Sequence, residues 1–127
     1  MLSKTVSANR QKSLTENGEP DVYDDGHLRV EHDNYYVSVR GRIIYFPRSE
    51  FLIVSRLART PGCVVSSEEL WQVAWGDQKP FNPLSLRVYI YRVRTKLGAC
   101  GDCIETVIGT GYRFRRVLKQ SCDSPDR

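Results

Sequence analysis

The chain has 127 residues, of which 40% are hydrophobic and 27% are charged, and its formal net charge is +4. This length is typical of one globular domain and excludes two domains with separate cores. No apolar run approaches the roughly 18 residues of a membrane span, and the first 20 residues lack the apolar segment of a signal peptide. We therefore expect a cytoplasmic protein that does not contact a membrane.

The two ends of the chain show no hydrophobic periodicity. Residues 1–20 are polar and end in Asn-Gly-Glu-Pro, and residues 119–127 read "KQSCDSPDR". Both patterns are typical of segments that cannot bury enough apolar surface to fold. We expect a disordered leader (1–20), one folded domain (21–118) and a flexible tail (119–127).

Short runs of β-branched and aromatic residues lie between Val22 and Phe46, separated by Asp-Gly, Asp-Asn and Arg-Gly turns. This alternation of strand and turn signals predicts an antiparallel meander of three or four strands. The clearest strands are expected at 27–31, 35–39 and 42–46.

After Pro47 the hydrophobic period changes to that of a helix. Apolar residues at helical spacing predict a first helix at 48–59 and a second at 67–75. Ser66 stands directly before the second helix and Glu69 follows three residues later in its first turn, as in a capping box. The sequence therefore predicts two helices joined by a short connection.

A third helix is predicted at 83–97, after the breaker-rich loop "DQKPFNP" and before Gly98. One stripe of it is strongly apolar and should face the core: Leu86, Ile90, Val93 and Leu97. The other face and the flanks mix apolar, aromatic, hydroxyl and basic side chains: Leu84, Arg87, Val88, Tyr89, Tyr91, Arg92, Arg94, Thr95 and Lys96. Such a mixture suits the major groove of DNA, where arginine pairs with guanine and methyl groups meet the thymine methyl. An ordinary basic surface helix is the alternative, although no acidic residue lies between Leu84 and Lys96.

The segment "ETVIGTGYRF" predicts a β-hairpin with strands at 104–108 and 112–117. Gly109 and Gly111 are expected to adopt positive φ in its turn. Ile104, Val107 and Phe114 are expected in the core, and the imperfect alternation predicts a β-bulge. Four other side chains of the hairpin are candidates to face phosphates: Thr106, Thr110, Arg113 and Arg115.

Charge is unevenly distributed along the chain. Residues 81–119 contain eight basic and two acidic residues, a balance of +6, whereas residues 21–80 contain seven basic and nine acidic residues, a balance of −2. A positive field confined to one third of a chain fits a polyanionic partner engaged by one face. A solvated basic surface would show the same asymmetry.

Cys100 and Cys103 form a CxxC pair that follows the helix stop at Gly98 and precedes a strand. A zinc site needs four ligands, and a thioredoxin-like motif opens a helix after a strand. Incidental loop thiols are the leading interpretation, and a redox-sensitive pair that modulates the neighbouring hairpin is the alternative. We expect no metal, no cofactor and no enzymatic activity, because no nucleophile with a neighbouring base is visible.

The predicted order is three or four strands, three helices and a terminal hairpin. This is an α+β winged helix-turn-helix with an N-terminal antiparallel sheet. The sequence also resembles the OmpR/PhoB-type winged-helix DNA-binding domain of bacterial response regulators, the effectors of two-component systems. The resemblance covers about residues 22–117 and is carried by "GRIIYFPRSEFLIVSRLARTPGCVVSSEELWQVAWG", "LRVYIYRVRTKLG" and "IETVIGTGYRF".

The resemblance implies that residues 83–97 form a recognition helix in the major groove and that 104–117 form a wing on the adjacent minor groove or backbone. Base contacts would fall on Val88, Tyr91 and Arg92. Phosphate contacts implied by the resemblance are Ser66, Trp75, Tyr89, Arg94 and Thr106, and the charge and hydroxyl pattern adds Arg87, Lys96, Thr110, Arg113 and Arg115. Asp77, Gln78 and Lys79 correspond to a transactivation loop that can contact RNA polymerase. Family members often bind direct repeats as dimers.

Three positions depart from the usual family pattern. Leu84 and Ile108 replace arginines, and Tyr89 replaces a histidine. The leading function is a sequence-specific double-stranded DNA-binding transcriptional regulator whose operator differs from those of its relatives. The alternative is a winged-helix module that binds a protein, with little or no DNA binding. We expect no receiver domain before Asp21, and hence a stand-alone regulator, an isolated effector domain or a subunit controlled elsewhere.

Overall fold

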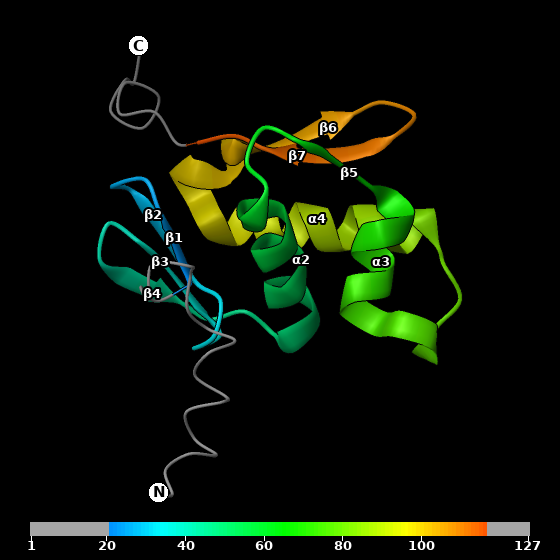
Figure 1. The fold of residues 1–127 in the computed structure, drawn as a ribbon, viewed down its shortest axis with the longest axis horizontal. Helices are drawn as coiled ribbons and strands as arrows, with labels where there is room; N and C mark the ends of the chain where they lie inside the picture. The colour runs from blue at the N-terminus through cyan, green and yellow to red at the C-terminus, as the bar shows by residue number, and fades with distance from the viewer. Residues whose placement is uncertain (1–20, 117–127) are drawn as a thin grey trace, which may run out of the picture.

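The computed structural model describes residues 21–116. The expected leader (1–20) and tail (119–127) lie outside the described residues. Figure 1 shows one sheet at the left, the helices from the centre to the right and a second sheet along the top. The expected α+β winged-helix architecture is confirmed, with an N-terminal antiparallel sheet, three helices and a C-terminal hairpin.

The N-terminal sheet has the strand order β1-β2-β3-β4, and neighbouring strands are antiparallel. Its strands are β1 (Val22–Asp24), β2 (Leu28–Glu31), β3 (Tyr36–Val39) and β4 (Arg42–Ile44). Two turns place non-glycine residues in the left-handed region, Tyr35 at φ 57° and Arg40 at φ 53°. The meander has four strands, which matches the predicted three or four. β1 is the strand that adds to the three expected most clearly.

The three helices begin and end at the predicted residues: α2 (Arg48–Arg59), α3 (Ser67–Trp75) and α4 (Pro83–Leu97). Ser66 caps α3, because its Oγ accepts a hydrogen bond of 3.1 Å from the Glu69 backbone N–H. Asn82 caps α4 by accepting from the N–H groups of residues 84 and 85, and Gly98 ends α4 at φ 62°. Local capping signals therefore fix the bounds of α3 and α4.

A second sheet contains the hairpin and one strand that sequence reasoning missed. Its order is β5-β7-β6, with β5 (Val64–Ser66), β6 (Ile104–Val107) and β7 (Gly111–Phe114). β5 lies directly before α3 and pairs with β7, residue 66 opposite Gly111. The wing, defined here as residues 104–114, is thus joined by β5 to the start of α3.

Two expectations for the wing are wrong. The pairing of β6 with β7 is regular over all four residues of each strand, so no bulge is present there. Gly109 has φ 81°, as expected, but Gly111 does not have positive φ. Gly111 is needed instead for close approach, because a Cβ there would lie 2.0 Å from the carbonyl oxygen of Val65. Its neighbour strand passes too near for any side chain.

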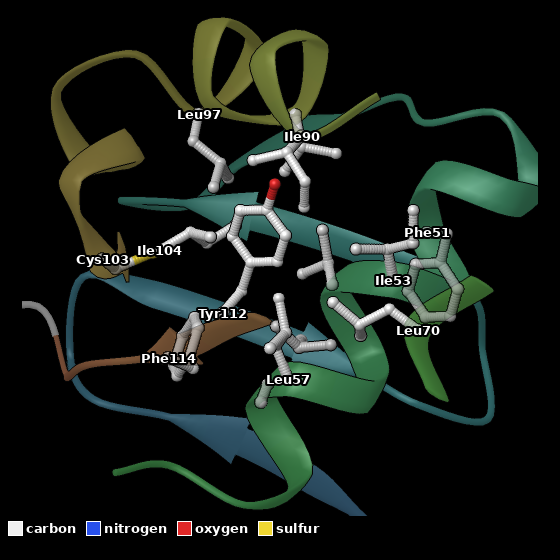
Figure 2. Packing of buried hydrophobic residues seen from close by; sticks show 14 of the residues in the cluster. Phe51, Ile53, Leu57, Leu70, Ile90, Leu97, Cys103, Ile104, Tyr112 and Phe114 are labelled. Carbon is white, nitrogen blue, oxygen red and sulfur yellow. The ribbon is translucent and has the colours of Figure 1, made fainter. Parts of the chain in front are cut away.

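One hydrophobic core unites the two sheets with the helices. The predicted core stripe of α4 is buried, as are Ile104 and Phe114, whereas Val107 is only half-buried. Figure 2 shows Tyr112 and Phe114 of β7 among Leu57 of α2 and Ile90 of α4. The wing is therefore fixed to the helices by its own core residues, and its position relative to α4 is set by packing.

His32 provides a test of the packing between the N-terminal sheet and α2. Its side chain is buried, and its Nδ1 lies 2.6 Å from the Ser55 Oγ. Burial, and to a smaller extent the Arg59 guanidinium, lower the pKa of His32 below its ordinary value. Because the pKa of His32 is depressed in the folded state, its imidazole binds a proton more readily in the unfolded chain than in the folded one.

The free energy of unfolding is expected to be highest above pH 6.5 and to fall as the pH drops below it. The loss is complete once the pH passes the depressed folded-state pKa of His32. Urea unfolding at a series of pH values between 7.5 and 5 measures this slope, and His32→Gln should flatten it. An equally steep slope in the variant would contradict the assignment to His32.

Candidate nucleic-acid interface

The outward face of α4 is exposed in the region predicted to bind DNA. At about 100° per residue, Leu84, Val88 and Tyr91 lie on the side of the helix opposite its core stripe. Their exposed fractions are 69%, 49% and 69%. The three-dimensional fold therefore leaves this stripe of α4 uncovered, as the helix pattern predicted.

Two arginines border this stripe. Arg87 and Arg92 are exposed and lie on opposite flanks of the helix. Arg87 faces the wing, because it lines an open groove together with Thr106 and Thr110. The exposed face of α4 thus presents an uncharged centre between two cations.

Aromatic side chains hold the second of these arginines. The Arg92 guanidinium lies 5.4 Å from the centre of the Tyr89 ring, and Tyr89 packs against Trp75 with ring centres 4.7 Å apart. Lys79 approaches the same Trp75 ring at 5.7 Å. Trp75 itself is buried. Trp75, which is predicted to contact phosphate, supports the Tyr89 ring in the structure. That ring in turn contacts the Arg92 guanidinium.

Arg94 links α4 to the wing. Its Nε and Nη2 donate to the carbonyl oxygen of Ile104 at 3.0 and 2.6 Å, and Nη2 also donates to the Thr106 Oγ1 at 3.0 Å. Arg94 is half-buried by these contacts. A phosphate contact by Arg94 stays a prediction, while the geometry shows a side chain that positions the wing.

Three other predicted phosphate contacts lie away from the groove or are engaged elsewhere. Lys96 forms an ion pair of 2.8 Å with the buried Glu50 at the start of α2. Arg113 and Arg115 both pair with Glu105, at 2.9 and 3.2 Å. Side chains alternate along a strand, so residues 105 and 113 lie on the face of the hairpin opposite Thr106. The structure thus does not bring these three cations together with Arg87.

The tip of the wing and the loop after α3 are both exposed. Ile108 is 92% exposed in the turn, and the backbone carbonyl oxygen of Thr110, two residues later, accepts a hydrogen bond of 3.2 Å from the backbone N–H of Ser67. Ser66, one residue earlier, uses its hydroxyl as the cap of α3. The loop contains the short 3-10 helix η1 (Gly76–Gln78), and Asp77, Gln78 and Lys79 are all exposed in it.

The two cysteines of the CxxC pair are buried within η2 (Gly98–Cys103), which follows α4. Gly101 between them touches the end of α4 so closely that a Cβ would lie 2.5 Å from the Arg94 carbonyl oxygen. Burial, with a further contribution from Cys100, holds the pKa of Cys103 well above its ordinary value. The thiolate form of Cys103 is therefore disfavoured, and both cysteine side chains belong to the hydrophobic core.

Within residues 21–116, no group of three or more His, Cys, Asp or Glu side chains is arranged to hold a metal ion. No helix in the same range combines the length and apolar character that crossing a membrane requires.

Known proteins resemble the chain in both sequence and structure. A family model described as "Transcriptional regulatory protein, C terminal" matches residues 41–114, more than half of the chain. The chain belongs to this family. The match contains all three helices and the wing, so the family assignment covers the whole candidate interface.

One relative by sequence is the uncharacterized transcriptional regulatory protein YvcP of Bacillus subtilis, which is 32% identical over 116 residues. The match covers 90% of this chain and 46% of YvcP. The transcriptional regulatory protein CseB of Streptomyces coelicolor is 32% identical over 94 residues, 71% of this chain and 38% of that protein. The chain spans less than half the length of these relatives.

Solved structures of the family agree with the fold. The response regulator DrrB of Thermotoga maritima, an OmpR/PhoB homologue, has a TM-score of 0.74 at 29% identity, covering 87% of this chain and 52% of DrrB. The DNA-binding domain of RstA from Klebsiella pneumoniae, solved with the RstA box, has a TM-score of 0.65 at 26% identity, covering 75% and 97%. The expected OmpR/PhoB-type resemblance is confirmed.

Proposed function

We propose that this domain binds double-stranded DNA in a sequence-specific manner and regulates transcription. The observation that carries the proposal is the exposed face of α4, which lies opposite the core and is flanked by Arg87 and Arg92. The major groove admits one α-helix, and its two borders are phosphate backbones. The RstA domain of the same fold was solved with its DNA box, which supports this mode of binding.

In this mode α4 lies in the major groove and the wing lies on the adjacent minor groove or backbone. Val88, Tyr91 and Arg92 reach base edges. Arg87, Thr106 and Thr110, which share one groove between α4 and the wing, contact phosphates. The exposed loop residues 77–79 are available to RNA polymerase, and two copies bind direct repeats. The domain acts by binding, without catalysis, in the cytoplasm.

Selection of duplexes from a random pool tests the proposal. The purified chain should enrich a short sequence, and its affinity should fall linearly with the logarithm of salt concentration. Fluorescence anisotropy with the selected duplex and with a scrambled duplex measures both terms. Absence of binding to either duplex at low salt would overturn the proposal.

Arg92→Ala is expected to cost about 1–3 kcal/mol in binding to the selected duplex and to relax preference at one base pair. The reason is that Arg92 is exposed, held over Tyr89, and able to pair with a guanine. Repeating the selection with the variant measures the preference directly.

Arg42→Ala is a matched control, because Arg42 is an exposed arginine of the N-terminal sheet, outside α4 and the wing. It should leave the selected sequence unchanged. Equal losses of affinity in the two variants would show that Arg92 contributes charge only.

The exposed apolar residues also fit a second function. Leu84 and Ile108 stand at positions where the family usually has arginine, and both are largely exposed. A protein partner could cover them. A winged helix that bound no duplex but retained a stable fold would favour this protein-interaction module.

A further inference from the structure

The centre of the exposed face of α4 is apolar. Leu84, Val88 and Tyr91 recur at spacings of four and three residues, so they form one continuous stripe along the helix. Leu84 and Tyr91 are each 69% exposed, and Val88 is 49% exposed. A solvated helix face would carry charges at these positions, and this one carries none.

The charges beside this stripe indicate what covers it. Arg87 and Arg92 lie on its two flanks, and the groove between α4 and the wing adds the hydroxyls of Thr106 and Thr110. A partner that matches this face has an anionic border beside Arg87, a hydrogen-bond acceptor beside Arg92 and an apolar floor. The major groove of DNA has phosphates along both borders, and the thymine methyl is the apolar group that its bases present there.

We propose that the Leu84–Val88–Tyr91 stripe reads the methyl groups of thymines in a run of T·A base pairs. The inference rests on the proposed DNA-binding function and names the sequence class that it recognises. Seven residues of helix span about 10.5 Å, and successive base pairs of one strand lie about 3.4 Å apart. The stripe therefore covers about three consecutive base pairs.

Recognition of the thymine methyl group by apolar contact can be distinguished by experiment from recognition by hydrogen bonds. Deoxyuridine differs from thymidine only by the missing methyl group and keeps the same hydrogen-bonding groups in the groove. Loss of one methyl group from a buried interface weakens binding about fourfold. The substitution leaves the phosphates unchanged. A loss of affinity after replacing contacted thymines would therefore report the lost methyl contacts.

The experiment uses the whole 127-residue chain and the duplex obtained by selection from a random pool. Each thymine of the selected site is replaced in turn by deoxyuridine, and affinity is measured by fluorescence anisotropy at fixed salt. We expect two or three adjacent positions at which the substitution weakens binding about fourfold, and no effect at the remaining positions.

Variants assign the effect to the stripe. Val88→Ala and Leu84→Ala should each reduce the preference for thymine over deoxyuridine at one of these positions and leave it unchanged at the others. Ile43→Ala is the control, because Ile43 is an exposed aliphatic residue of β4, 65% exposed, in the other sheet. It should leave the preference unchanged.

Two negative results are distinguishable. Binding of the selected duplex with the same affinity after every thymine has been replaced would overturn the methyl reading and leave the proposed DNA-binding function standing. Failure to bind any duplex at low salt would overturn both.

Discussion

Gly111→Ala is expected to lower the free energy of unfolding by about 3 kcal/mol, the upper end of the usual cost of overpacking. The added Cβ would lie 2.0 Å from the Val65 carbonyl oxygen and 2.8 Å from the Ser66 Cα. Both neighbours are backbone, so no side chain can rotate to make room. β5 must move away from β7, and the movement reaches α3 because Ser66 caps that helix.

Gly109→Ala is the matched control two residues away. Gly109 has φ 81° with open space around its Cα, so its substitution costs only the strain of a left-handed residue, about 1–2 kcal/mol. Chemical denaturation of both variants compares the two costs. A Gly109 variant less stable than the Gly111 variant would show that turn strain, and not strand spacing, governs the wing.

The bounds of α3 and α4 could be predicted because their signals are local. Ser66 and Asn82 stand at the N-caps, Gly76 and Gly98 stand at the C-caps, and apolar residues between them recur at helical spacing. Each of these signals lies within a few residues of the helix end that it determines. Tertiary packing did not need to be known.

β5 and the role of Gly111 could not be predicted, because both depend on a contact between distant segments. β5 has three residues and pairs with a strand about 45 residues later in the chain. A run of three residues carries no readable period. Without β5 in view, Gly111 appeared to be a turn residue. The expected bulge came instead from the imperfect alternation of apolar residues in the hairpin.

Only part of the candidate site could be predicted, because some of its contacts also join distant segments of the chain. Helical geometry alone places Val88, Tyr91 and Arg92 on the side of α4 opposite its core, and the structure leaves them exposed. Sequence charge cannot show which cations are already paired, so the ion pairs of Arg113 and Lys96 could not be foreseen, and their phosphate contacts stay predictions. Their carboxylate partners come from another strand and from another helix.

Lys96→Met is expected to lower the free energy of unfolding by about 3 kcal/mol. Glu50 is 2% exposed and its Oε1 lies 2.8 Å from the Lys96 Nζ, so removing the ammonium group leaves a buried carboxylate without this ion pair. The value lies at the lower end of the range for broken buried pairs because Lys96 is itself partly exposed. Met is an unbranched apolar side chain without the ammonium group, which in the wild type also lies 5.5 Å from the centre of the Phe46 ring. Urea denaturation measures the loss.

The double variant Glu50→Gln/Lys96→Met separates an ion pair from a DNA contact. Replacing both partners removes the unpaired charge, so the double variant should recover most of the stability that Lys96→Met loses. Binding of the double variant to a scrambled duplex should keep the wild-type salt dependence, because Lys96 is directed toward α2 and away from the wing. A salt slope lower by about one would instead mean that Lys96 leaves Glu50 to contact a phosphate when DNA binds. The ion pair would then be a property of the free domain, and DNA binding would carry the cost of breaking it.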